Sequence, residues 1–234
     1  MRALLLSLCL LACGGSTGPG ETSYPVVGRG EAAIPFDVKG WTVTLTIAEL
    51  GFGPAYFCAT AAASSDLCPV AVSEFAASGT VNALDPALQP LGTGGGQAGA
   101  VRSATFDYAW TWFPTQQQAR PTAAAPRGHS AYFEGTAVKD AQTVHFVAGV
   151  DLAPRIQGTR AVEGVRVDAT LDGEGLQLVV GVAPSPWWRN VDFDALALAG
   201  TDPVVIAAGS RAYESLVLAL TASAPPSLIW TSTP

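Results

Sequence analysis

Apolar and polar residues alternate along several segments of the chain, and this pattern predicts β-strands. Over residues 41–47, large apolar side chains alternate with threonines, a period of two in residue types that favour strands. Four aromatic residues form a second alternating row: Phe106, Tyr108, Trp110 and Trp112. We expect further short strands near Phe57, over residues 70–75, near Val191 and over residues 204–207.

Pairs of such segments predict two hairpins. Residues 132–138 and 143–150 flank a four-residue connection. Residues 162–171 and 176–183 flank Asp172-Gly173-Glu174-Gly175, and an Asp-Gly step suits a tight turn because both residues tolerate positive φ. Two further stretches are expected to be loops, namely the Gly-rich residues 92–99 and residues 114–128. For the second of these, disorder is preferred to a functional role.

One helix is predicted near the end of the chain. Apolar residues recur at helical spacing over residues 213–220, Ser210 can cap the start, and Pro225-Pro226 block continuation. Many short strands followed by one late helix predict a mainly β fold, an antiparallel β-sandwich or open barrel with one C-terminal helix. We expect a single domain over residues 24–234 that ends at this helix.

The N-terminal residues have the pattern of an export signal. Arg2 supplies one positive charge, and residues 3–12 are apolar except for one serine, a run too short to span a bilayer stably. Leu10-Leu11-Ala12-Cys13 resembles the bacterial lipobox. The resemblance implies that residues 1–12 are removed and that Cys13 is lipidated. An ordinary signal peptide that is cut later, leaving Cys13 a spare thiol, is the alternative.

The lipobox resemblance also implies an address. Gly14 rather than Asp follows Cys13, which in that family implies an outer-membrane lipoprotein. The residues up to 23 are rich in Gly, Ser, Thr and Pro, so we expect residues 13–23 to form a flexible tether.

The formal net charge is −7, and the basic residues are scattered. A protein without a basic stripe is not expected to bind nucleic acid.

Two cysteines remain once Cys9 is removed with the signal and Cys13 carries lipid. An exported chain meets an oxidising compartment, so Cys58 and Cys68 are predicted to form a disulfide. A metal site is the rival interpretation, but the spacing is not CxxC and no histidine lies near in sequence.

The mature part is similar to uncharacterised exported lipoproteins from bacteria of high genomic GC content. This similarity implies no activity and no functional residue. The similarity is loose but touches most of the mature chain. The motifs on which it depends are Gly40-Trp41-Thr42-Val43, the run from Leu50 to Cys58, Leu67-Cys68, Val101-Arg102-Ser103, and Trp188 with Val191-Asp192-Phe193.

Catalytic patterns are weak. His129 and His145 are expected on the strands of one hairpin, on the order of 20 Å apart, which is too far for both to bind one metal ion. Gly128-His129-Ser130-Ala131-Tyr132 resembles a nucleophile elbow but has Tyr132 in place of the final glycine, and a strand is expected to follow where the elbow needs a helix. We therefore predict no catalytic residue and no cofactor.

Two neighbouring clusters remain as candidate sites. Asn190, Asp192 and Asp194 repeat oxygen side chains at every second position, as in the opening of a calcium loop, although a solvated strand face is the preferred interpretation. Asp192 and Asp194 are also spaced as a carboxylate pair for glycoside hydrolysis. Trp187, Trp188 and Arg189 are the candidate binding surface, because adjacent strand residues point to opposite faces and exposed Trp beside Arg is typical of interfaces. Packing of both rings at one end of the sandwich is the alternative.

Together these patterns predict a non-enzymatic lipoprotein at the outer membrane that serves binding or envelope assembly. The partner is an envelope protein or a small molecule. A carboxylate-dependent hydrolase and a metal-handling accessory lipoprotein are the alternatives.

Overall fold

The computed structural model describes residues 20–61, 70–173 and 175–233. The lipobox and Cys68 lie outside these ranges. The first strand begins at Glu21, so the predicted tether is too long by three residues at its C-terminal end. No helix in the described ranges is both long enough and apolar enough to cross a membrane.

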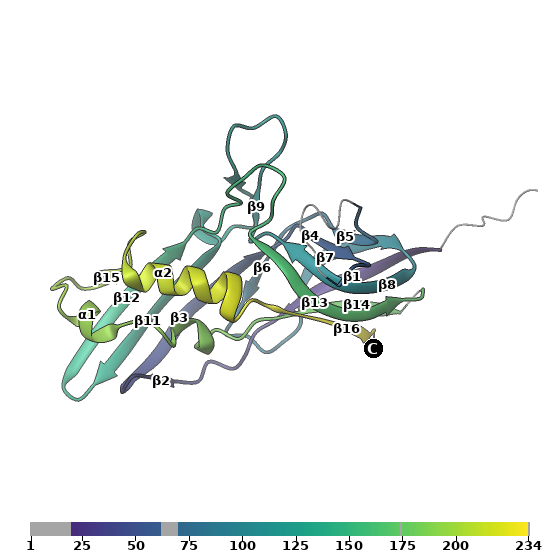
Figure 1. The fold of residues 1–234 in the computed structure, drawn as a ribbon. Helices are drawn as coiled ribbons and strands as arrows, with labels where there is room; N and C mark the ends of the chain where they lie inside the picture. The colour runs from purple at the N-terminus through teal and green to yellow at the C-terminus, as the bar shows by residue number, and fades with distance from the viewer. Residues whose placement is uncertain (1–19, 62–69, 174, 234) are drawn as a thin grey trace, which may run out of the picture.

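The larger sheet has eight strands and is nearly closed on itself, like a barrel (Figure 1). Its strands, in spatial order, are β13 (Val162–Leu171), β8 (Gly99–Phe106), β4 (Ala55–Cys58), β5 (Ser73–Phe75), β7 (Gln89–Gln97), β1 (Glu21–Arg29), β14 (Leu176–Gly181) and β16 (Ser227–Ser232). Neighbouring strands are antiparallel except β1 and β14, which are parallel.

A second sheet lies beside the first and carries the helices on one face (Figure 1). It contains β15 (Val204–Val205), β12 (Gln142–Val150), β11 (Ala131–Lys139), β3 (Trp41–Phe52) and β2 (Phe36–Val38), and β6 (Gly79–Asn82) pairs with β3. A two-stranded ribbon joins β9 (Trp110–Thr111) to β10 (Arg120–Pro121). The helical elements are η1 (Pro126–Gly128), η2 (Ser185–Trp188), α1 (Phe193–Ala197), α2 (Arg211–Leu218) and the π-turn Ala219–Ser223.

One continuous buried cluster runs through both sheets. On the side of the second sheet its centre is Trp188, whose ring lies 4.7 Å from Phe146 and 5.4 Å from Phe133, centroid to centroid. In the barrel-like sheet, Trp230 of β16 lies 4.4 Å from the ring of Tyr24, edge to face. Because large aromatic side chains bury much apolar surface, these contacts contribute strongly to stability.

The predicted mainly β fold with one C-terminal helix is confirmed. Ser210 caps α2, since its Oγ accepts a hydrogen bond from the backbone N–H of Tyr213 at 3.2 Å. The chain does not end there, because β16 follows the helix and forms an edge of the larger sheet. The aromatic row of residues 106–112 is not one strand, since β8 ends at Phe106 and Ala109 has a positive φ of 55°.

Only one of the two predicted hairpins forms. β11 and β12 pair throughout, from Ala131 opposite Val150 to Lys139 opposite Gln142, and Asp140 adopts a φ of 53° in the turn. The second hairpin is wrong. β13 pairs with β8, while β14 pairs with β1 and β16, so the two strands around Asp172-Gly173 do not pair with each other. An Asp-Gly turn permits a hairpin, but the pairing of β14 with β1 and β16 on its two sides leaves no free edge of β14 for β13.

The Gly-rich residues 92–99 form strand rather than loop, since β7 runs to Gln97 and β8 starts at Gly99. Their glycines are explained by close contacts. A Cβ atom on Gly94 would collide with the ring of Tyr24, and one on Gly96 would collide with the backbone carbonyl of Val72. Glycine inside a strand is typical of such approaches. The segment 114–128, for which disorder was predicted, is also ordered and contains β10 and η1.

These contacts predict that Gly96→Ala lowers the free energy of unfolding by about 1 to 3 kcal/mol, the usual cost of overpacking. The carbonyl of Val72 cannot move freely, because it accepts a hydrogen bond from the N–H of Gln97 at 2.9 Å. Gly99→Ala is the control, since its Cβ would meet only Val72 Cγ1 at 3.5 Å. Urea denaturation of both variants checks the prediction, and equal stabilities would contradict it.

Candidate binding pocket

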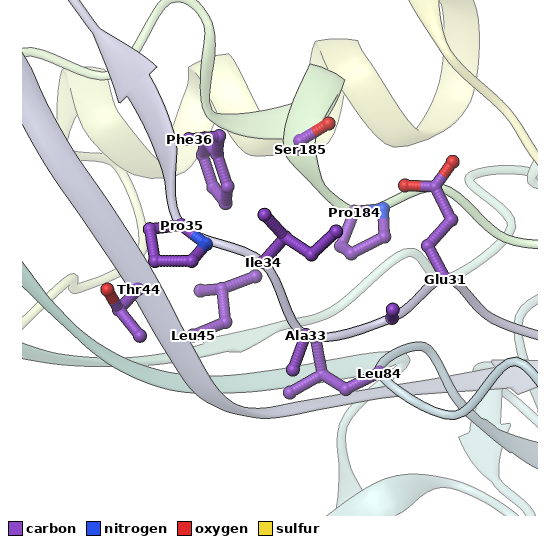
Figure 2. A pocket seen from close by; sticks show the side chains of 11 residues that line it. Glu31, Ala33, Ile34, Pro35, Phe36, Thr44, Leu45, Leu84, Pro184 and Ser185 are labelled. Carbon is purple, nitrogen blue, oxygen red and sulfur yellow. The ribbon is translucent and has the colours of Figure 1, made fainter.

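An open pocket of about 540 Å³ lies between the connection from β1 to β2 and the first turn of η2 (Figure 2). Its walls come from three parts of the chain that are distant in sequence. The lining residues are Glu31, Ala32, Ala33, Ile34, Pro35, Phe36, Thr44, Leu45, Leu84, Pro184 and Ser185. Ile34 is central in this view, and its side chain is 70% exposed. An exposed isoleucine in the middle of an apolar hollow leaves apolar surface that a ligand can cover.

The connection that forms one wall is fixed at its start by backbone hydrogen bonds. The N–H of Gly30 donates to the carbonyl of Asp85 at 2.9 Å, and the N–H of Glu31 donates to the carbonyl of Ala83 at 3.0 Å. A Cβ atom on Gly30 would collide with the backbone of Ala83, so this close approach requires glycine. The chain then runs past the pocket without strand pairing until β2 starts at Phe36.

The opposite wall depends on the parallel pairing of β1 with β14. The N–H of Val182, just after β14, donates to the carbonyl of Arg29 at 2.9 Å, which keeps the two chains side by side past the end of the sheet. Pro184 and Ser185 follow directly and reach the pocket from that side. Pro184 is buried. The rigid proline therefore forms a preformed part of the wall.

The polar groups of the pocket are few and oxygen-based. Figure 2 shows Pro35 and Phe36 on one side of Ile34 and Glu31 on the other, with Ser185 between Phe36 and Glu31. Thr44 adds a second hydroxyl beside the apolar end. The lining contains no histidine, cysteine, lysine or arginine. This combination suits a ligand that has an apolar body and a cationic or hydrogen-bond-donating group near Glu31, and it lacks a nucleophile paired with a base.

Trp187 and Trp188 do not form a binding surface, which corrects the sequence-based hypothesis. Their side chains are 1% and 0% exposed because the segment is a 3-10 turn packed under α2 rather than a strand. Trp187 Nε1 donates to the carbonyl of Ala224 at 2.8 Å, and Trp188 packs against Phe133. Arg189 alone is exposed. Packing of both rings into the core is therefore the correct interpretation of this Trp pair.

Asp192 and Asp194 both have structural partners. Asp192 is the N-cap of α1 and accepts a hydrogen bond from the N–H of Ala195 at 3.1 Å, so the predicted strand here is wrong. Asp194 accepts from Lys139 Nζ at 2.8 Å and from the indole of Trp41 at 3.1 Å. These partners lower the pKa of Asp194, first through Lys139.

Within the described ranges, no group of three or more His, Cys, Asp or Glu side chains could hold a metal ion. The backbone carbonyl of Asn190 accepts a hydrogen bond from Lys39 Nζ at 3.3 Å, so this residue also serves local structure.

The histidines and Ser130 have structural partners as well. His129 and His145 each pair with a carboxylate, Asp151 and Asp202 respectively, with Nδ1 to Oδ1 distances of 2.8 Å. Ser130 is fully buried, and its Oγ accepts a hydrogen bond from the N–H of Leu152 at 2.9 Å. A buried hydroxyl used in this way is not an exposed nucleophile, and β11 follows it, as expected from the sequence.

Sequence patterns missed a buried ion pair between the sheets and the loops. Asp107 is 0% exposed, and its carboxylate accepts hydrogen bonds from the N–H of Ala161 at 2.8 Å and from Arg160 at 3.3 Å. The Arg160 guanidinium lies over the ring of Tyr56, 4.4 Å from its centroid. Burial raises the pKa of Asp107 to about 6, and the two donors only partly oppose this rise. A lone aspartate between aromatic residues gives no periodic signal that could have identified it.

Comparison of the chain with protein-family models, with curated proteins and with solved structures finds no match. The site is therefore defined by its own geometry. The fold and the pocket describe a mainly β protein with an open, mainly apolar pocket.

The raised pKa of Asp107 predicts a pH-dependent cost to stability. The folded chain holds this proton up to about pH 6, whereas an unfolded aspartate loses it near pH 4, so stability falls as pH rises through this window. Asp107→Asn removes the titration. We expect the variant to gain about 2 to 3 kcal/mol relative to the wild type between pH 4 and pH 7.

Chemical denaturation at a series of pH values measures this difference. Asp168→Asn is the control, because it makes the same substitution at a carboxylate that is 56% exposed. Parallel pH profiles for the wild type and Asp107→Asn would contradict the prediction.

Proposed function

We propose that this protein is a lipoprotein of the cell envelope, anchored at the outer membrane through Cys13, whose β domain binds a small ligand. The ligand has an apolar body and a cationic or hydrogen-bond-donating end. The ligand-binding part of the proposal rests on the lining of the pocket. This lining is mostly apolar and has the Glu31 carboxylate near one end. The anchoring part depends on the resemblance of Leu10-Leu11-Ala12-Cys13 to a lipobox.

Binding is favoured over hydrolysis for two reasons. Asp192 caps a helix and Asp194 is paired with Lys139, so the carboxylates considered for catalysis already have structural roles. The pocket itself offers one carboxylate and two hydroxyls, from Glu31, Thr44 and Ser185, and no hydrogen bond among the described side chains joins this carboxylate to either hydroxyl. An apolar body in such a pocket gains from the surface removed from water, roughly 25 cal/mol per Å².

A neutral fluorescent probe, N-phenyl-1-naphthylamine, tests the pocket directly. We expect its fluorescence to rise on binding and its affinity to fall about tenfold in Ile34→Asp, because a carboxylate in the centre of the apolar wall must be desolvated. Leu198→Asp is the matched control, since Leu198 is 87% exposed on the surface outside the pocket.

The charge preference gives a second measurement in the same assay. A long-chain alkylamine should displace the probe better than an alkyl carboxylate of equal length, because Glu31 attracts the ammonium group. Glu31→Gln should reduce this preference without abolishing probe binding. Equal displacement by both amphiphiles, or equal probe affinity in Ile34→Asp and the wild type, would rule out this ligand class.

The anchor is tested by the mass of the protein extracted from membranes. We predict a chain that begins at Cys13 and carries acyl groups, since several acyl chains hold a protein on a bilayer stably where one does not. Cys13→Ser should release the protein from the membrane fraction. A mature form of unmodified mass in the wild type would refute the anchor.

The Cys58–Cys68 disulfide stays part of the same proposal. Cys58 is fully buried at the end of β4, while Cys68 lies outside the described residues. A disulfide would fit an exported chain and would close a short loop, adding roughly 3 kcal/mol to stability on the chain-entropy model. Peptide mapping without reductant would identify the pairing.

A further inference from the structure

Two loops project together from the body of the molecule, above the label β9 in Figure 1. One comprises residues 112–120, from the end of β9 to the first residue of β10, and the other comprises residues 152–160, between β12 and β13. We call them the paired loops. The side chain of Gln157 donates a hydrogen bond to the carbonyl of Phe113 at 3.1 Å, and the indole of Trp112 donates to the carbonyl of Gln116 at 3.0 Å. The first bond joins the two loops, and the second stabilises the 112–120 loop internally.

The paired loops present apolar side chains to solvent. Phe113 is 58% exposed and Ile156 is 66% exposed, one on each loop. Both are large hydrophobic residues of a kind that is usually buried. The hydrogen bond from Gln157 to the backbone of Phe113 joins the two loops next to these residues in sequence. Apolar residues gathered on a projection are typical of a surface that meets another phase or partner.

The charge of the paired loops is opposite to that of the chain. The whole protein has a formal net charge of −7, yet the paired loops contain three arginines and no Asp, Glu or Lys. Arg120 and Arg155 are exposed, and no ion pair to either is found among the described residues. The third, Arg160, is paired with buried Asp107 at the base. Two exposed guanidinium groups of the paired loops are thus free to meet external anions.

We propose that the paired loops are a membrane-contact site: Phe113 and Ile156 enter the interface of an anionic lipid surface while Arg120 and Arg155 contact its phosphate groups. An aromatic and an aliphatic side chain gain by leaving water for the acyl boundary. Each arginine near an anionic leaflet adds about 1 kcal/mol. The contact is independent of the ligand pocket and of the lipid on Cys13.

A lipid surface fits this projection better than a protein partner does. A stable protein interface buries about 800 Å² on each side, usually with a flat or complementary surface. Here Phe113 and Ile156 are the large exposed apolar residues of the paired loops, which is little apolar surface for such an interface. Two such side chains can enter a deformable lipid phase without a matching cavity. The acidic body of the protein would oppose approach to an anionic membrane by its other faces, so the charge pattern also sets the orientation.

Vesicle cosedimentation of the full chain carrying Cys13→Ser tests the proposal, with vesicles of phosphatidylglycerol and phosphatidylcholine or of phosphatidylcholine alone. All variants share residues 1–12, so only differences between variants are interpreted. Phe113→Ser with Ile156→Ser should weaken binding to anionic vesicles about tenfold. Arg120→Gln with Arg155→Gln should weaken it about fivefold for each arginine, and added salt should remove this difference.

Matched controls carry the same chemical changes elsewhere on the surface. Leu198→Ser and Arg189→Gln alter exposed residues outside the paired loops and should leave binding unchanged. Hydrogen–deuterium exchange of the unsubstituted loops gives a second readout, with protection of peptides from residues 112–120 and 152–160 only when anionic vesicles are present. Equal binding by the loop variants and the controls, equal binding to both vesicle types, or unchanged exchange in the paired loops would overturn the proposal.

Discussion

The parallel pairing of β1 with β14 is the contact on which the rest of the structure depends. It joins a strand near the start of the described chain to one near its end, with Val26 opposite Leu178. β16 then adds to β14 and nearly closes the larger sheet. The same pairing carries Pro184 alongside Glu31 and so forms the pocket. Ordering such distant segments costs chain entropy, which burial of the common core has to offset.

Close contacts inside the barrel-like sheet explain why a strand can be built from glycine. β7 has little side-chain surface of its own, yet Tyr24 lies across Gly94, and its hydroxyl hydrogen-bonds to Ser73 on β5 at 2.5 Å. The ring fills the space that side chains of β7 would otherwise occupy. Burial raises the pKa of Tyr24 to about 12, so its hydroxyl keeps its proton at any physiological pH and the contact is maintained.

Charged residues are few, and the buried ones have a different role from the exposed ones. In the interior, Asp107 holds Arg160 against Tyr56 and so fixes the base of the loop before β13. The exposed pairs of Lys139 with Asp194 and of His145 with Asp202 are solvated and contribute little to stability. The pocket carries one carboxylate, and the paired loops carry two exposed arginines for which no ion pair is found among the described residues. Ligand and membrane would thus meet different parts of the chain with opposite charge.

The sequence by itself determined the features that depend on neighbouring residues: the mainly β character, the β11–β12 hairpin and the helix capped by Ser210. Local periodicity and capping are encoded within a few residues, so a pattern can identify them. Only the tertiary structure decided that β13 and β14 separate, that Trp187 and Trp188 are buried, and that the pocket lies between segments about 150 positions apart. Such pairings are chosen by the total burial and hydrogen bonding of the folded chain, which no short stretch of residues specifies.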